Sequence, residues 1–193
     1  MSPRANLDRE AVIQAAADLA DREGLHGLTM AALAKQLGVR TPSLYNHVDG
    51  LPGLHRALAL RGGREINARL ARAAVGKAGG EAVKAVAEAL RGYIREHPGV
   101  YATAVPATPP DGAQGAELEA LNRETLDIVL ATLAHYRFGE QEALHAVRAL
   151  RSLVHGFATL ELAGGFGIPL DTEESFAYLV QSLIDGLEQR AAR

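Results

Sequence analysis

The 193-residue chain contains no cysteine and no tryptophan, and aromatic residues make up only 5% of it. Without cysteine the chain can form no disulfide bond, no thiolate nucleophile and no cysteine-ligated zinc site, and this absence favours a reducing cytoplasm. No apolar run approaches the roughly 20 residues that a membrane span needs, and the N-terminus lacks the apolar core of a signal peptide. We therefore expect a soluble cytoplasmic protein that makes no membrane contact.

Motifs that carry catalysis or bind metals are also missing. The sequence has no phosphate-binding glycine loop, no nucleophile motif and no HExxH motif. His135, His145 and His155 do not form a pair at i, i+4 spacing. We expect no metal, no cofactor and no enzymatic activity. The acidic residues of the first predicted helix are expected to form a solvated face: Asp18, Asp21 and Glu23.

Helical periodicity dominates what is present, and no segment shows the alternation of a strand. The predicted fold class is all-α, with a three-helix head at residues 1–49 on a bundle of five or six helices at residues 50–193. Gly62-Gly63 lies inside the first long helix of the bundle and could be a kink, a close packing point or a hinge. The Pro- and Gly-rich residues 106–115 are the best candidate for disorder.

The stretch from Thr29 to Val48 predicts two short helices joined by a tight turn. Thr29 suits the N-cap of the first helix, and Gly38 suits the left-handed residue that ends it. Thr41 is expected to cap the second helix, with Pro42 at its first position. The apolar positions with the spacing of one buried seam are Leu33, Leu37, Val39, Leu44 and Val48.

This seam would leave hydroxyl, amide, phenol and imidazole groups facing outward: Thr41, Ser43, Tyr45, Asn46 and His47. Such groups can form hydrogen bonds with base edges and phosphates. The pattern is typical of a helix-turn-helix, whose second helix enters the DNA major groove. The net charge of the chain is −3, but its two parts differ weakly in charge. Residues 1–64 carry eight Lys and Arg and six Asp and Glu, whereas residues 65–193 carry twelve Lys and Arg and seventeen Asp and Glu.

The first 60 or so residues resemble the N-terminal domain of the tetracycline-repressor (TetR) family of transcriptional regulators. The matching segments are Ala11–Gly24, Leu28-Thr29, Leu33-Ala34, Leu37–Val39 and Ser43–Val48. The resemblance implies a homodimer of all-α subunits that binds double-stranded DNA at a palindromic operator. It also implies repression that ends when a small-molecule effector binds the C-terminal, dimerising domain.

The resemblance also assigns roles by position. Thr29 would contact phosphate, and Tyr45 and His47 would mainly hold the DNA backbone. The residues presented to bases would be Arg40, Thr41, Pro42, Ser43 and Asn46.

The chain departs from the family pattern at two places that often carry DNA-contacting side chains. Ala31 and Ala32 stand in the first helix of the motif, and Asp49 and Leu51 stand near the start of the fourth helix. These departures place DNA readout more heavily on residues 40–47, and Arg4 on the N-terminal arm is a candidate for compensation.

Candidate effector contacts are fewer and more ambiguous. Tyr93, His97 and Tyr101 recur at a spacing of four residues, which fits either core packing or a pocket wall with polar tips. His155 precedes Gly156 in the segment Leu153–Phe166, which resembles a subgroup with a His-Gly pair on the penultimate long helix. His155 could be an interface or core residue, or an effector ligand. The remaining pocket candidates are Phe157, Phe166 and Tyr178.

The last two long helices carry more apolar residues than one bundle face requires. A four-helix dimer interface, with two helices from each subunit, would bury this surplus. The main interpretation is a ligand-responsive repressor. The alternative is a DNA-binding adaptor whose bundle binds a protein, and a closed, polar-tipped cavity in the bundle would distinguish the first from the second.

Overall fold

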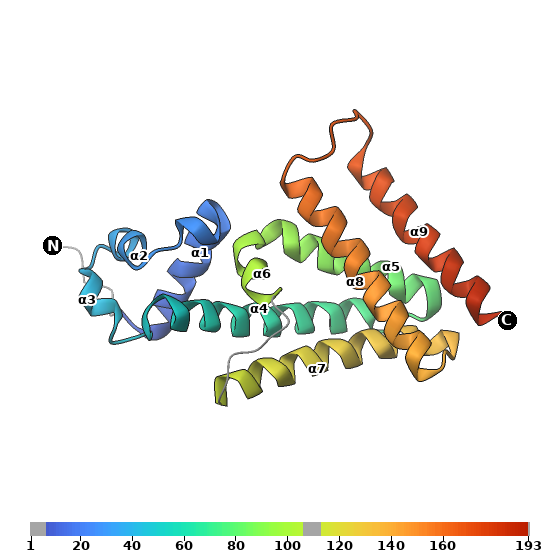
Figure 1. The fold of residues 1–193 in the computed structure, drawn as a ribbon, viewed down its shortest axis with the longest axis horizontal. Helices are drawn as coiled ribbons and strands as arrows, with labels where there is room; N and C mark the ends of the chain where they lie inside the picture. Colours follow the sequence, from blue (N-terminus) through green and yellow to red (C-terminus); the bar gives the residue numbers. More distant parts are fainter. Residues whose placement is uncertain (1–6, 106–112, 193) are drawn as a thin grey trace. The chain divides into compact units, whose positions relative to one another are not determined.

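The computed structural model describes residues 7–105 and 113–192, and all regular structure within these ranges is helical (Figure 1). The predicted all-α class is therefore confirmed. The residues cluster into two compact units, one formed by the chain up to Arg64 with Glu96–Ala120, the other by Glu65–Arg95 with Leu121 onward. No helix in the described ranges is long and apolar enough to cross a membrane. The prediction about Arg4 and that of disorder at residues 106–112 lie outside the described residues, whereas residues 113–115, which were included in that prediction, are helical.

The first two helices of the head each begin after a residue whose side chain caps the helix. Helix α1 (Arg9–Gly27) begins after Asp8, whose carboxylate accepts a hydrogen bond from the Ala11 N–H at 2.8 Å. Helix α2 (Met30–Leu37) begins after Thr29, whose hydroxyl oxygen accepts from the Ala32 N–H at 3.1 Å, and it ends at Gly38 with φ of 66°. The predicted cap at Thr29 and the predicted left-handed Gly38 are both confirmed.

Helix α3 (Thr41–Leu44) is shorter than predicted, and its cap is one residue earlier. The Arg40 carbonyl accepts the first hydrogen bond of the helix, from the Ser43 N–H at 2.9 Å, so Thr41 is the first helical residue and not the cap. Beyond Leu44 the chain continues in turns, in which the N–H groups of His47 and Val48 both donate to the Leu44 carbonyl, at 2.9 and 3.1 Å, and α4 begins at Gly50, at φ of 63°. The predicted second helix is therefore a single helical turn that ends at Leu44, short of Val48.

The predicted apolar seam forms the core of the head. Leu33 and Leu44 are fully buried, and Val48 is nearly so, while Leu37 and Val39 are partly buried against the same cluster. Burial of one such side chain contributes roughly 1.5–3 kcal/mol to stability. The seam therefore fixes the short helix α3 on α1 and α2, although a four-residue helix has almost no stability of its own.

Helix α6 (Pro98–Ala104) packs on α1 within the same unit. The Asp21 carboxylate accepts hydrogen bonds from the N–H groups of Gly99 and Val100, both at 2.9 Å, and lies 3.0 Å from Nδ1 of His97. Val100 is buried in the head core. The expectation that Asp21 belongs to a solvated face is therefore wrong, because its carboxylate satisfies the first backbone N–H groups of α6.

Helix α4 (Gly50–Ala74) runs without interruption through Gly62-Gly63. The boundary between the two compact units falls after Arg64, so α4 contributes to both. The predicted domain boundary between residues 49 and 50 separates the predicted DNA-binding head from the predicted effector-binding domain. This functional division remains a prediction.

The second unit is a helical bundle. Its elements are α5 (Gly79–Glu96), most of α7 (Ala113–Leu133), the 3-10 turn η1 (Ala134–Tyr136), α8 (Glu140–Leu162) and α9 (Thr172–Ala191). Figure 1 shows α8 and α9 running in opposite directions, joined by the loop at residues 163–171. Asp171 caps α9, because its carboxylate accepts a hydrogen bond from the Glu173 N–H at 2.7 Å.

The close approach of α6 to α1 predicts that Gly99→Ala destabilises the protein. A Cβ atom at Gly99 would lie 2.1 Å from the Ala20 carbonyl oxygen, which is backbone and cannot move aside cheaply. We expect a loss of about 1–3 kcal/mol in the free energy of unfolding, or more, measured by chemical denaturation. Gly167→Ala is the control, because a Cβ there meets nothing within 4 Å. Equal stability of the two variants would contradict the described packing.

Candidate functional site

One surface of the head gathers the polar side chains of α3 and its flanking turns. Arg40, Pro42 and Asn46 are exposed, and Tyr45 is 58% exposed although it is a large aromatic residue. Thr41, Ser43 and His47 are partly exposed around them. The buried Leu44 in their midst holds this segment on the core. Thr29 is exposed at the start of α2.

These groups have the chemistry of a DNA-reading surface. A guanidinium such as that of Arg40 can donate two hydrogen bonds to guanine, an amide such as that of Asn46 can pair with adenine, and Pro42 can contact a thymine methyl group. Hydroxyl and phenol groups can donate to phosphates, which position a protein on the duplex. Ala31 is exposed on α2 but offers no polar group, so the polar surface is concentrated at residues 40–47.

The second unit contains a buried cation, Arg91, in the middle of α5. Its side chain is only 5% exposed. Nε and Nη2 donate to the two carboxylate oxygens of Glu161 on α8, at 3.0 and 2.6 Å, and Nη1 and Nη2 donate to those of Glu173 on α9, at 2.7 and 3.0 Å. Arg95 also donates to Glu173, at 2.9 Å. Charge-assisted bonds of this forked kind are strong and geometrically specific.

The ion cluster changes the proton affinities of its members. The hydrogen bond from Arg91 holds the pKa of Glu161 below its ordinary value, against the opposing effect of burial. Burial alone would lower the pKa of Arg91, but the hydrogen bonds to Glu161 and Glu173 outweigh it and raise that pKa. Both groups therefore stay charged at neutral pH.

Aromatic rings enclose the same guanidinium. Its central carbon lies 4.6 Å from the ring centre of Phe176 and 5.2 Å from that of Phe157, within cation–π range. Phe157 contacts Phe166 and Phe176, with ring centres 4.8 and 5.1 Å apart. The structure therefore brings together the predicted Phe157 and Phe166, and it places Phe157 beside a cation that was not among the predicted site residues.

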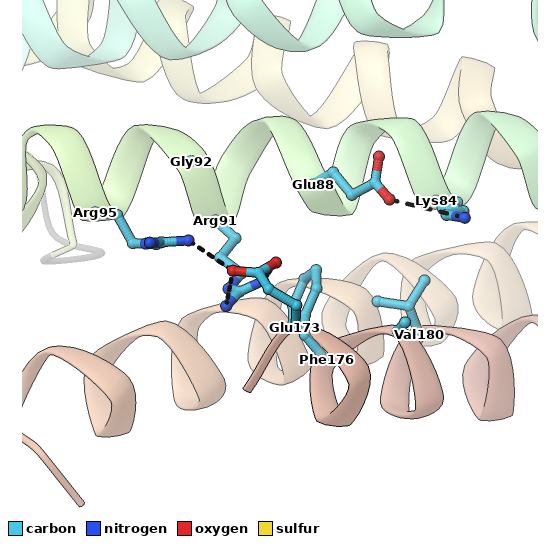
Figure 2. A pocket seen from close by; sticks show the side chains of 9 residues that line it. Lys84, Glu88, Arg91, Gly92, Arg95, Glu173, Phe176 and Val180 are labelled. Carbon is cyan, nitrogen blue, oxygen red and sulfur yellow. Dashed lines mark hydrogen bonds and ion pairs between the residues drawn. The ribbon is translucent and has the colours of Figure 1, made fainter. Parts of the chain in front are cut away.

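A cavity of about 290 Å³ adjoins this cluster between α5 and α9 (Figure 2). Figure 2 shows Arg91 and Arg95 directed at Glu173 from α5, with Phe176 and Val180 on α9. Lys84 and Glu88 form a weaker ion pair, at 3.9 Å, further along α5. The cavity combines fixed charges with an apolar wall, which is the usual make-up of a small-molecule site.

The other predicted pocket residues are dispersed. Tyr93 is buried and its hydroxyl donates to Glu65 at 2.8 Å, whereas the His97 ring bonds to Asp21 on α1 and Tyr101 is buried in α6. His155 is partly buried on α8. Tyr178 is 78% exposed on α9.

Two residues, Arg91 and Asp21, have roles that the sequence predictions did not include, and only Arg91 carries a signal in the sequence. Arg91 follows Val83 and Ala87 at four-residue steps, so a charge stands on an apolar helical stripe, which indicates a paired buried cation. Asp21 had no such signal, because its partners lie in α6, nearly 80 residues along the chain. Among the described residues no group of three or more His, Asp or Glu could hold a metal ion.

Known proteins resemble both parts of the chain. The family model described as bacterial regulatory proteins, tetR family, matches residues 12–47, and the model described as tetracyclin repressor-like, C-terminal domain, matches residues 83–183. The uncharacterised HTH-type transcriptional regulator Rv0681 of Mycobacterium tuberculosis is 38% identical over 186 residues, covering 96% of this chain and 84% of the relative. The uncharacterised HTH-type transcriptional regulator YobS of Bacillus subtilis is 34% identical over 188 residues, covering 97% and 96%.

Solved structures share the fold. A variant of TetR from Acinetobacter baumannii AYE, in complex with minocycline, superposes with a TM-score of 0.73 at 24% sequence identity. The match covers 96% of this chain and 99% of that one.

The buried ion cluster predicts a pH-dependent loss of stability in Arg91→Met. The substitution leaves Glu161 buried without its partner, which should cost about 3–5 kcal/mol at neutral pH. Because the pKa of Glu161 is lowered in the folded protein, its contribution is present above the ordinary carboxyl range and is lost as the pH falls through that range and below. Denaturation from pH 7 downward should show the gap between wild type and variant narrowing. A gap independent of pH would contradict the assignment.

Proposed function

The chain belongs to the TetR family of transcriptional regulators, and from this premise we propose that it is a cytoplasmic homodimeric repressor released from a palindromic operator by a small-molecule effector. Its relatives are DNA-binding regulators and not enzymes. The observation that carries the proposal is the exposed polar surface of α3, held on a buried apolar seam.

DNA readout rests in this proposal on the segment from Arg40 to His47. Arg40, Thr41, Pro42, Ser43 and Asn46 are the proposed base contacts. Thr29, Tyr45 and His47 are the proposed backbone contacts. The exposure of Tyr45 supports this role, because a phenol ring in a purely structural position would be buried in the head core.

Dimerisation is assigned to the outer face of α8 and α9. Leu160 is 52% exposed and Tyr178 is 78% exposed on this helix pair. A Cβ atom added at Gly156 or Gly186 would meet nothing of its own chain within 4 Å, so a second copy could approach the backbone there. A two-fold interface of this kind would place two α3 segments on successive half-sites of a palindrome.

The effector is assigned to the second unit, where apolar and charged groups already converge. Phe157 lies beside Arg91, and Phe166 packs against Phe157, so the two rings offer an aromatic wall near fixed charges. Of the other predicted contacts, Tyr93 and His155 lie in this unit, whereas His97 and Tyr101 pack in the first unit and Tyr178 is exposed on the proposed dimer face. An effector would act by stabilising an arrangement of the two heads that no longer fits the operator.

The DNA assignment predicts that Arg40→Ala and Tyr45→Ala each weaken operator binding by about 1–3 kcal/mol. The operator would first be selected from random duplex DNA, and affinities would then be measured by fluorescence anisotropy at several salt concentrations. Arg72→Ala is a matched control, because it removes the same exposed charge from the end of α4. Wild-type affinity in both head variants would refute the recognition surface.

The dimer assignment predicts that Tyr178→Arg yields monomers, because it would bury an unpaired charge in the interface. Sedimentation velocity measures the change directly. Val75→Arg is the control, since Val75 is 75% exposed but follows α4 and lies outside the proposed interface. A dimeric Tyr178→Arg protein would place the interface elsewhere.

A further inference from the structure

The two carboxylates of the buried ion cluster differ strongly in their access to water. The side chain of Glu161 is 15% exposed and that of Glu173 is 63% exposed, although both bind the guanidinium of Arg91. Glu161 occupies the Nε and Nη2 side of the fork, and Glu173 occupies the Nη1 and Nη2 side. An exposed ion pair contributes much less to stability than the loss of a buried partner costs. Glu173 is therefore the partner that Arg91 can exchange.

The start of α9 is held by contacts that do not involve the Glu173 side chain. The Asp171 carboxylate accepts a hydrogen bond from the backbone N–H of Glu173 at 2.7 Å, and the Ser175 hydroxyl donates to the Asp171 carbonyl at 2.9 Å. Phe176, in the next turn, is buried. The Glu173 side chain can therefore turn away from Arg91 by a change of its own rotamer, while the helix stays capped and packed.

The charges of the cluster balance only while the Glu173 carboxylate is in place. Two cations and two anions make up the cluster: Arg91, Arg95, Glu161 and Glu173. The other ion pair at the cavity, between Lys84 and Glu88, adds no net charge. When Glu173 turns away, one positive charge remains without compensation beside a guanidinium that is only 5% exposed. Such a site favours the binding of one negative charge.

The cavity beside these charges has the size and the wall for a small organic molecule. Its volume of about 290 Å³ is close to the lower limit, about 300 Å³, of ordinary small-molecule sites. Figure 2 shows the Glu173 carboxylate at the ends of Arg91 and Arg95, with the Phe176 ring beside it. A ligand carboxylate at that position would place its apolar body on this wall. The apolar lining residues are Gly92, Phe176, Ala177 and Val180.

We propose that this cavity binds a small monocarboxylate with an apolar body, and that the ligand carboxylate replaces that of Glu173 on Arg91 and Arg95. The proposal rests on the ligand-responsive regulator proposed above and names the chemical class of its effector. Glu161 keeps its own bonds to Arg91, so α8 stays tied to α5, whereas the side-chain tie from α5 to α9 is broken. A neutral molecule cannot make this exchange, because it would leave a buried positive charge without compensation.

Isothermal titration calorimetry with benzoate tests the ligand class, and benzamide is a neutral control of nearly the same shape. We expect benzoate to bind the wild-type protein about tenfold more tightly than benzamide, because an ionised acceptor forms the stronger hydrogen bonds with arginine. Inorganic phosphate carries the charge without an apolar body, so it should bind more weakly than benzoate. Benzamide or phosphate binding as tight as that of benzoate would overturn the ligand class. The absence of benzoate binding would overturn the site.

Glu173→Gln tests the exchange itself. This variant keeps the size of the side chain but removes the internal competitor, so benzoate should bind about fivefold more tightly than to the wild-type protein. Glu174→Gln is the matched control, because Glu174 is exposed on the same turn but does not line the cavity. Its affinity for benzoate should equal that of the wild type. Unchanged or weaker benzoate binding in Glu173→Gln would overturn the exchange.

Arg95→Gln tests the location of the site independently. The Arg95 side chain is 49% exposed, so the fold should be retained, which circular dichroism checks. We expect benzoate to bind about tenfold more weakly, because one of the two cations that meet the carboxylate is lost. Wild-type affinity for benzoate in this variant would place the bound benzoate elsewhere and overturn the proposed site.

Operator binding in the presence of benzoate separates the effector role from the carboxylate site. Release of the selected operator by benzoate and not by benzamide, with the response weakened in Arg95→Gln, would support the effector class. Calorimetric binding of benzoate with unchanged operator affinity would overturn the effector role and leave the carboxylate site intact. A wild-type protein that selects no DNA sequence would overturn the proposed function, while calorimetry would still decide whether the site exists.

Discussion

One buried guanidinium joins the three helices on which the second unit depends. Arg91 on α5 binds Glu161 on α8 and Glu173 on α9 with both of its forks, under the rings of Phe157 and Phe176. A buried charge tolerates few positions for its partners, because any displacement leaves it unpaired in a poorly solvated site. The cluster therefore sets the positions of α8 and α9 relative to α5, and with them the loop, the cavity and the proposed dimer face.

The head depends on a different kind of constraint, which is apolar and mostly local. The side chains of Leu33 and Leu44 fix α2 and α3 on α1 and leave the polar residues of α3 exposed. Asp21 then binds the backbone N–H groups at the start of α6, and Val100 enters the head core. Helix α6 is thus packed as part of the unit that carries the proposed DNA surface. Helix α6 directly follows α5 in the sequence, and α5 carries Arg91.

The helices that carry the two proposed activities follow one another closely along the chain. Helix α5 carries the ion cluster beside the cavity, and α6 follows it after His97 and contacts α1. Helix α4 also belongs to both units, and Arg64 alone separates its Gly62-Gly63 pair from the boundary. In the proposed mechanism, these connections along the chain are the route by which an effector bound in the second unit would act on the head.

The sequence by itself determined the helical class, the caps at Thr29 and Gly38, the buried seam of the head and the family. Each of these depends on residues that are close in the chain, where periodicity and capping act directly. Only the tertiary structure decided the role of Asp21, because a carboxylate on a helix looks solvated until a distant helix presents free N–H groups to it. The same holds for the partners of Arg91: the apolar stripe of α5 could indicate a buried charge, but 70 or more residues separate it from Glu161 and Glu173. The short length of α3 was likewise visible only in the tertiary structure, since a single helical turn is held by the packing of Leu44 and not by its own propensity.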